Sequence, residues 1–312
     1  MYDPNVVFEC KYELDSLASF LSLSNQYYSH TGDTSFTGKR WLMALDKVLA
    51  VIEEQQMPTF SSTGAAQRQA YTFQRKSTLG TETLNLGGIG NPISNGTGLV
   101  RSAFRPSDDA AILQFFIPGN AFMAVELRRT AGLLEKVKQT ELAPLVLRLA
   151  ETIEAGIWEH GVFQHPVFGE VFAYEVDGYG SRIFMDDANL PSLLSLPLLG
   201  FLDSHNKVYQ NTRKMVLSME GNPYFLNGTQ FKGIGGPHIG ITHAWPISLL
   251  VQILTTDNDE EILALLEMVM KASPLGLIHE SVNVEKIRDY TSKIPFPTPP
   301  PPLWPCLYRA AD

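Results

Sequence analysis

Apolar side chains recur at helical spacing over most of this chain. In the first such segment, Tyr12–Tyr28, leucine and alanine return every three or four positions until the break at Thr31-Gly32. A second segment, Phe36–Ile52, repeats the pattern after a short link. Two amphipathic helices joined by so few residues predict an antiparallel helical hairpin.

The same periodicity predicts further helices downstream. We expect one from Asp109 to about Leu134. Ser107 or Asp108 is expected to cap it, and Pro118-Gly119 to break it into two parts. The remaining expected helices are Thr140–Trp158, Leu190–Leu199, Lys207–Ser218, Trp245–Thr256 and Asp259–Ser273.

Three segments depart from helical periodicity. Val162–Asp177 alternates apolar and polar residues, which predicts a short β-hairpin inserted between helices. Ser61–Ser102 is rich in Gly, Ser, Thr and Asn, which indicates a long loop of the kind that usually has a function. The last residues, from Ile294 onward, are too dense in proline to form a helix.

Together these patterns predict an all-α toroid of helical hairpins with a small β-hairpin insertion. We expect a single domain over residues 1–291, followed by a proline-rich tail over residues 292–312. A long α-solenoid is the alternative architecture, but the absence of a repeat at fixed spacing counts against it.

Composition narrows the classes of function. The chain has 312 residues, 44% of them hydrophobic, and a formal net charge of −9. The acidic balance argues against nucleic acid as a partner, since phosphate contacts need clustered Lys and Arg. The longest apolar runs, such as Leu190–Leu202, are interrupted and too short for a membrane span. Met1-Tyr-Asp-Pro-Asn has no signal-peptide pattern, and only Cys10 and Cys306 occur, so no disulfide framework is expected.

Two separated acidic motifs suggest the chemistry. Asp108 and Asp109 follow Arg105 in an Arg-Pro-Ser-Asp-Asp segment, and Glu280 lies far downstream in Ile278-His-Glu-Ser. Two carboxyl groups that converge in a pocket are what hydrolysis of a glycosidic bond needs. Capping of a helix is the alternative role for the two aspartates.

A third acidic segment and a glycine-rich segment could each have a structural role or bind a ligand. Phe184-Met-Asp-Asp-Ala-Asn lies before Pro191, a favourable first residue of a helix, so capping and turn formation compete with sugar binding. Gly233–Gly240 lacks the Lys-Ser/Thr ending of a phosphate-binding loop. The histidines show no metal-ligand spacing, so we expect neither a metal nor a cofactor.

Six ordered motifs resemble glycoside hydrolase family 125 over roughly Phe8–Tyr290, and Tyr12-Glu-Leu-Asp-Ser-Leu-Ala-Ser-Phe-Leu resembles its fungal branch. In chain order the motifs are Arg105-Pro-Ser-Asp-Asp-Ala, Ala173-Tyr-Glu-Val-Asp-Gly-Tyr-Gly, Phe184-Met-Asp-Asp-Ala-Asn-Leu-Pro-Ser-Leu-Leu, Asn222-Pro-Tyr-Phe, Gly233-Ile-Gly-Gly-Pro-His and Ile278-His-Glu-Ser.

The resemblance implies an (α/α)6 toroid and a metal-independent, inverting exo-α-1,6-mannosidase that acts on terminal α-mannose. It implies that Asp109 is the general acid, with Asp108 the alternative, and that Glu280 is the general base. In inverting enzymes the two carboxyl groups stand about 6.5–9.5 Å apart. The residues implied as sugar contacts are Arg105, Asp186, Asp187, Asn189, His238 and His279.

Two departures from the family pattern qualify this expectation. A Trp-Leu-Arg-Asp-Ser segment that contributes to the family's sugar pocket does not occur in this sequence. After Thr291 the family's closing helix is replaced by the proline-rich tail. The resemblance therefore implies an incomplete toroid, and the alternative function is a catalytically inactive fragment or a carbohydrate-binding remnant of such an enzyme.

Overall fold

The computed structural model describes residues 10–291, which divide into two compact units. The first comprises the described residues up to Phe184 together with Pro191–Thr212. The second comprises Met185–Leu190 and the described residues from Arg213 onward.

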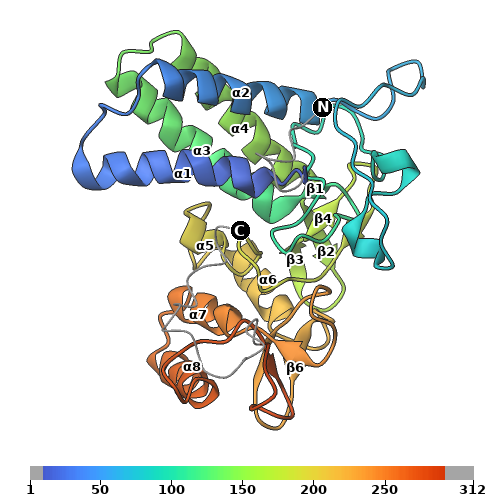
Figure 1. Ribbon diagram of the computed structural model, residues 1–312, viewed down its shortest axis with the longest axis vertical. Helices are drawn as coiled ribbons and strands as arrows, with labels where there is room; N and C mark the ends of the chain where they lie inside the picture. The colour runs from blue at the N-terminus through green and yellow to red at the C-terminus, as the bar shows by residue number, and fades with distance from the viewer. Residues whose placement is uncertain (1–9, 292–312) are drawn as a thin grey trace, which may run out of the picture. The chain divides into compact units, whose positions relative to one another are not determined.

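Four long helices form the body of the first unit (Figure 1). They are α1 (Leu14–Thr31), α2 (Lys39–Gln56), α3 (Ile117–Lys136) and α4 (Leu142–His160). Helices α1 and α2 run antiparallel, as do α3 and α4, and α3 packs against both α1 and α4. Buried apolar residues cover most of the surface of α3, which makes it the centre of this unit.

The predicted first hairpin is confirmed, with each helix shifted by about two to four residues from the expected bounds. Helix α1 ends at Gly32, which adopts the left-handed conformation (φ 68°) that glycine tolerates without steric cost. The Trp41 indole of α2 donates a hydrogen bond to the Ser24 hydroxyl of α1 over 2.9 Å. This polar contact between buried side chains fixes how the two helices face each other.

The expected helix Asp109–Leu134 is wrong over its first eight residues, because α3 begins only at Ile117. Pro118 lies in the first turn of α3, where its missing N–H removes no intrahelical hydrogen bond, so it starts the helix and does not break it. Ser107 and Asp108 therefore do not cap this helix. Just before α3 the backbone is extended at Phe116.

Short strands flank these helices. Strand β1 (Phe115–Phe116) pairs with β4 (Glu175–Val176), which pairs with β5 (Arg182–Ile183), all antiparallel. Strands β2 (Val162–His165) and β3 (Gly169–Phe172) form the hairpin expected from the alternating pattern. Its predicted range was too long, because the residues of β4 pair with β1 and β5 and not within this hairpin.

The long loop predicted over Ser61–Ser102 is confirmed. It contains only two single-turn 3₁₀ helices, η1 (Gly80–Glu82) and η2 (Leu86–Gly88). The Phe73 ring packs edge-on against the buried Phe104 ring, with centroids 5.1 Å apart. The loop is thereby attached to the segment that leads into the Arg-Pro-Ser-Asp-Asp motif.

The helix predicted over Leu190–Leu199 is mostly wrong, since only α5 (Leu196–Leu199) is helical. The Ser192 N–H donates to the Ser195 hydroxyl, which in turn donates to the Ser192 carbonyl. Such local hydrogen bonds compete with a helix. Pro197, and not Pro191, occupies the first helical turn.

The chain leaves the first unit within α6 (Lys207–Val216), close to the predicted bounds. In the second unit, α7 (Pro246–Leu254) and α8 (Asp259–Ala272) form a further helical pair, as predicted. The Asn258 side chain caps α8 by accepting hydrogen bonds from the Glu260 and Glu261 amides.

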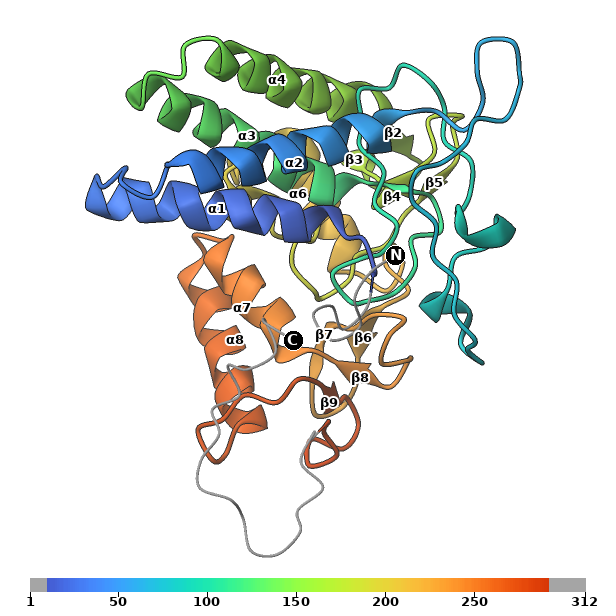
Figure 2. The same cartoon turned by 45° about the horizontal axis from the view of Figure 1, so that its top comes forward.

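Two strand pairs complete the second unit (Figure 2). Strand β6 (Phe225–Asn227) pairs with β7 (Lys232–Ile234), and β8 (His243–Ala244) pairs with β9 (Val282–Asn283). An apolar core connects these strands to α7 and α8. The proline-rich tail predicted over residues 292–312 lies outside the described residues.

A close approach of α4 to the long loop gives a first test of this packing. A Cβ atom on Gly156 of α4 would overlap the Thr97 carbonyl oxygen and press on Leu99. We expect Gly156→Ala to lower the free energy of unfolding by about 1–3 kcal/mol in urea titrations. Gly132→Ala in α3 is the control, because nothing lies within 4 Å of its Cβ position and alanine favours a helix. Equal effects of the two substitutions would contradict the packing described.

Candidate active site

The Arg105–Asp109 segment forms a tight turn in the first unit. The Asp108 N–H donates to the Arg105 carbonyl over 2.9 Å, and the Arg105 N–H donates to the Asp109 carbonyl over 2.8 Å. Asp108 adopts a left-handed backbone (φ 67°), which is unusual for a residue with a side chain. The two aspartates consequently differ in exposure: the Asp108 side chain is 59% exposed, whereas Asp109 is 2% exposed.

A buried ion pair holds the beginning of this turn. The Arg105 Nε atom lies 2.6 Å from the Glu175 Oε1 atom of β4, and neither side chain reaches solvent. The other Glu175 oxygen accepts hydrogen bonds from the Ile112 and Leu113 amides at 3.0 and 2.9 Å. The Arg105 guanidinium also lies over the Tyr174 ring, 5.3 Å from its centroid. Glu175 therefore ties both flanks of the aspartates to the small sheet.

Arg105 was predicted as a sugar contact, and the structure gives it this second role as an anchor. Glu175 was not among the predicted site residues, although it lies within the Ala173-Tyr-Glu-Val-Asp motif. A carboxylate inside a two-residue strand carries no local signal that it pairs with an arginine 70 residues away. Only the tertiary structure shows that pairing.

Removing the negative charge of the Arg105–Glu175 ion pair is expected to be strongly destabilising. Glu175→Gln removes the carboxylate charge that pairs with the buried Arg105 guanidinium, so we expect a loss of about 3 kcal/mol in the free energy of unfolding. Glu154→Gln is the matched control, because Glu154 pairs with Arg128 near the surface and should contribute less than about 1 kcal/mol. Urea unfolding of both variants measures the difference, and similar losses would rule out the anchoring role.

The residues that precede α1 lie against the same turn. The Phe104 N–H donates to the Tyr12 carbonyl over 3.1 Å, and the Leu14 N–H donates to the Ser102 hydroxyl over 3.0 Å. The Lys11 ammonium lies 3.7 Å from an Asp108 carboxyl oxygen. The start of α1 and the aspartate turn thus form one surface of the first unit.

The predicted acidic turn of the second unit is buried. The Asp186 and Asp187 side chains are both inaccessible to solvent. One Asp187 oxygen accepts hydrogen bonds from the Asn189 backbone at 2.9 Å and from its side-chain amide at 2.7 Å. A Cβ atom on Gly236 would lie 2.6 Å from the Asp187 carboxylate, so the glycine-rich segment is needed for this close approach. Exposed His238 lies two residues further along that segment.

Glu280 lies in the loop between α8 and β9, and its side chain is half-buried. The loop is fixed at its end, where the Thr291 N–H donates to the Ser281 carbonyl over 3.0 Å. The neighbouring His279 ring stacks on the Tyr290 ring with centroids 3.5 Å apart, and burial lowers the pKa of its imidazole. These contacts fix the end of the loop that carries the predicted base.

The structure thus places the predicted residues in three groups. Arg105, Asp108 and Asp109 share one turn of the first unit. Within the second unit, the acidic turn contacts the glycine-rich segment, while His279 and Glu280 occupy the loop before β9. Among residues 10–291, no three His, Cys, Asp or Glu side chains gather in an arrangement that could hold a metal ion.

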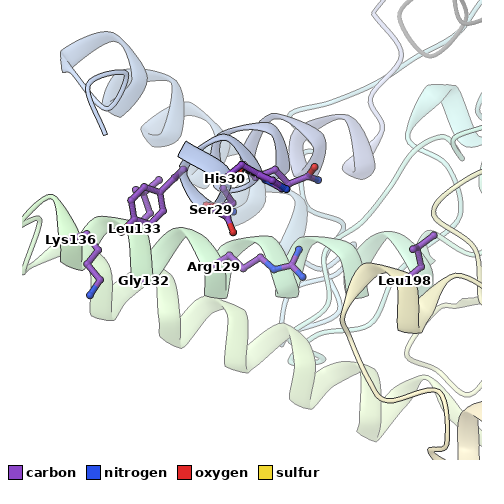
Figure 3. A pocket seen from close by; sticks show the side chains of 10 residues that line it. Ser29, His30, Arg129, Gly132, Leu133, Lys136 and Leu198 are labelled. Atoms are coloured by element: carbon purple, nitrogen blue, oxygen red, sulfur yellow. Dashed lines mark hydrogen bonds between the residues drawn. The ribbon is translucent and has the colours of Figure 1, made fainter. Parts of the chain in front are cut away.

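A pocket of about 630 Å³ lies elsewhere on the first unit, between α1 and α3 (Figure 3). Ser29 and His30 of α1 face Arg129 and Lys136 of α3 across it. None of the predicted site residues lines this pocket, so it is separate from the candidate site. Within the part of the chain that the structure describes, no helix has the length and apolarity to cross a membrane.

Both the sequence and the fold are similar to those of known proteins. The chain is 54% identical over 292 residues to the meiotically up-regulated gene 157 protein of Schizosaccharomyces pombe, covering 93% of this chain and 57% of that protein. Its fold is similar to that of a metal-independent α-mannosidase from Streptococcus pneumoniae, with a TM-score of 0.85 and 32% identity. That structure is a non-productive complex with α-1,6-mannobiose, and the match covers 92% of this chain and 66% of the bacterial one.

This similarity confirms the predicted fold class of helical hairpins. The chain spans less than two thirds of the length of either relative. The model of one family, described as metal-independent alpha-mannosidase (GH125), matches residues 1–294. The chain therefore belongs to glycoside hydrolase family 125, the metal-independent α-mannosidases.

Proposed function

We propose that this chain carries the catalytic residues of an inverting exo-α-1,6-mannosidase, which releases terminal mannose from α-mannosides. The observation that supports the proposal most is the similarity, over 92% of the chain, to a mannosidase whose structure holds α-1,6-mannobiose. Family membership supports hydrolysis of mannosides in general. The linkage and the stereochemistry are the parts that experiment has to test.

In this proposal Asp109 is the general acid. Its carboxyl group is buried on a turn that Arg105 and Glu175 hold in place, and such rigidity suits a group that must meet one oxygen atom of the substrate. Asp109 donates its proton to the glycosidic oxygen as the bond between that oxygen and the mannose C1 breaks. The leaving sugar departs with its hydroxyl group restored.

Glu280 is the general base. Its carboxylate accepts a proton from a water molecule, and the water oxygen bonds to C1 on the face opposite the leaving group. The product is β-mannose, with the configuration at C1 inverted. The protonated Glu280 and the ionised Asp109 then exchange protons with solvent, which restores both groups for the next cycle.

The buried acidic turn and the histidines are proposed to bind the sugar. Each sugar hydroxyl is both a donor and an acceptor, so carboxylates, amides and imidazoles can all bind it. His279 is favoured for such a contact in its neutral form, since burial lowers its pKa. The proposed sugar contacts are Arg105, Asp186, Asp187, Asn189, His238 and His279.

The direct test is incubation of the purified 312-residue chain with α-1,6-mannobiose, followed by proton NMR of the first anomer released. We expect β-mannose to appear first and α-mannose to follow by mutarotation. Release of α-mannose first would contradict an inverting mechanism. Absence of release from a chain that is folded by circular dichroism and binds mannobiose would instead favour a carbohydrate-binding remnant.

A further inference from the structure

The pocket between α1 and α3 has no part in the mechanism above (Figure 3). Its volume of about 630 Å³ is that of a small-molecule site. The described residues that line it include three basic side chains, His30, Arg129 and Lys136, and neither an aspartate nor a glutamate. In a chain with a net charge of −9, such a lining favours an anionic ligand.

A glycine between the two cations of α3 leaves the pocket open at this point. Arg129, Gly132 and Lys136 follow one another at intervals of three and four residues, so they lie on one face of the helix. Within the described part of the chain, a Cβ atom on Gly132 would meet nothing within 4 Å. The space beside Gly132 is therefore a notch in which one anion can contact both neighbouring cations.

The Arg129 side chain is held in place by contacts outside this notch. Its Nη1 atom donates to the Glu126 carboxylate over 2.6 Å, and its Nη2 atom donates to the Leu199 carbonyl over 3.2 Å. A Cβ atom on Gly200 would lie 2.7 Å from Nη2, so glycine is needed there for this approach. A guanidinium has more N–H donors than these two contacts use. Because it is already oriented, it can bind a phosphate group at a small cost in entropy.

A buried network fixes the two helices that form the pocket. The Asn25 amide of α1 donates to the Glu126 carboxylate over 2.8 Å and to the Thr130 hydroxyl over 3.1 Å. Asn25 and Glu126 are both almost fully buried. The Glu126 carboxylate therefore joins α1 to Arg129, and the pocket keeps its shape without a ligand.

The helix ends give a competing explanation for two of the basic residues. His30 lies in the last turn of α1 and Lys136 in the last turn of α3, where cations offset the partial negative charge of the carbonyl ends. That partial charge is roughly half an elementary charge for each helix, so the Lys136 ammonium keeps an excess of positive charge. This explanation also accounts for neither the notch at Gly132 nor the position of Arg129.

We propose that this pocket binds a phosphorylated sugar. The phosphate group occupies the notch at Gly132, where Arg129 and Lys136 both contact it. The sugar hydroxyls bind the Ser29 hydroxyl and the His30 Nε2 atom, since His30 Nδ1 is directed to the Gln26 carbonyl over 2.8 Å. The inference does not depend on the proposed mannosidase activity, because none of the proposed catalytic or sugar-binding residues lines this pocket.

The first arm of the test is isothermal titration calorimetry of the 312-residue chain with glucose 6-phosphate. Glucose replaces mannose in this probe so that the candidate active site is not the preferred site. We expect a Kd on the order of 0.1–1 mM, with inorganic phosphate and glucose each binding at least about tenfold more weakly. Equal binding of either reference compound, or no binding of glucose 6-phosphate at about 10 mM, would overturn the inference.

The second arm locates the ligand with variants. Gly132→Leu fills the notch, and leucine favours a helix, so the fold should persist while binding weakens by at least about tenfold. Lys136→Gln removes one cation and should weaken binding by about tenfold. Lys47→Gln is the matched control, because Lys47 is an exposed residue of α2 that does not line the pocket. Circular dichroism checks the fold, and wild-type affinity of Gly132→Leu would show that the site is elsewhere.

The candidate active site provides the last comparison. Gly132→Leu and Lys136→Gln should release mannose at the wild-type rate, since neither residue belongs to the proposed mechanism. If the wild type releases no mannose but the titrations give the expected affinities, the pocket assignment stands and the mannosidase proposal fails. If Asp109→Asn abolishes binding of glucose 6-phosphate while Gly132→Leu does not, the ligand occupies the candidate active site and the pocket assignment fails.

Discussion

Replacing Glu280 with glutamine is expected to reduce mannose release by about 10³-fold or more while leaving the fold intact. Glutamine has nearly the same shape as glutamate, but its amide cannot accept a proton from the attacking water. Glu280 is half-buried on a loop whose end is fixed by the Ser281–Thr291 hydrogen bond, so the substitution should not disturb the second unit. Initial rates on α-1,6-mannobiose measure the loss, and circular dichroism checks the fold.

A nearby carboxylate provides the control. Glu285 lies five residues beyond Glu280 and is exposed. It accepts hydrogen bonds from the Thr229 backbone and hydroxyl. Glu285→Gln should keep wild-type activity, because this carboxylate has no place in the proposed mechanism. An activated leaving group should not rescue Glu280→Gln, since attack by water still needs the base. Turnover of Glu280→Gln at wild-type rates would remove Glu280 from the mechanism.

Much of the helical framework could be predicted from apolar periodicity, because these helices bury one face. The first hairpin, α4, α7 and α8 all lie within a few residues of their expected bounds. The errors occurred where local chemistry competes with periodicity. At Asp109–Phe116 the apolar residues serve a turn and a strand, and at Ser192–Ser195 the serine hydroxyls satisfy the backbone outside a helix.

The candidate site was less accessible to sequence reasoning, because its supporting contacts join distant segments. The Arg105–Glu175 ion pair and the bridge between Glu13 and Phe104 depend on tertiary structure alone. The catalytic roles of Asp109 and Glu280 came from the family resemblance and not from residue patterns. They are proposals that the variants of Asp109 and Glu280 test.

Sequence reasoning also left the choice between Asp108 and Asp109 open, and the structure gives a physical basis for it. Asp109 is buried on the anchored turn, whereas Asp108 is largely exposed and lies beside Lys11. An acid that must meet one glycosidic oxygen needs a fixed position. This difference favours Asp109 as the acid.

Asp109→Asn is accordingly expected to lower kcat on α-1,6-mannobiose by about 10³-fold, because the amide cannot donate a proton to the departing oxygen. Asp108→Asn should retain far more activity, because Asp108 is largely exposed and is not the proposed proton donor. The two variants differ by one position in the same turn, so general damage to the turn would affect both.

A substrate with a better leaving group distinguishes loss of the general acid from loss of the fold. A mannoside with a dinitrophenolate leaving group needs little protonation, because that group departs readily as an anion. We expect Asp109→Asn to hydrolyse such a substrate at a rate within about tenfold of the wild type, while its activity on mannobiose stays low. Glu280→Gln should be inactive on both substrates. If Asp108→Asn shows the selective rescue and Asp109→Asn does not, the assignment is reversed and Asp108 is the acid.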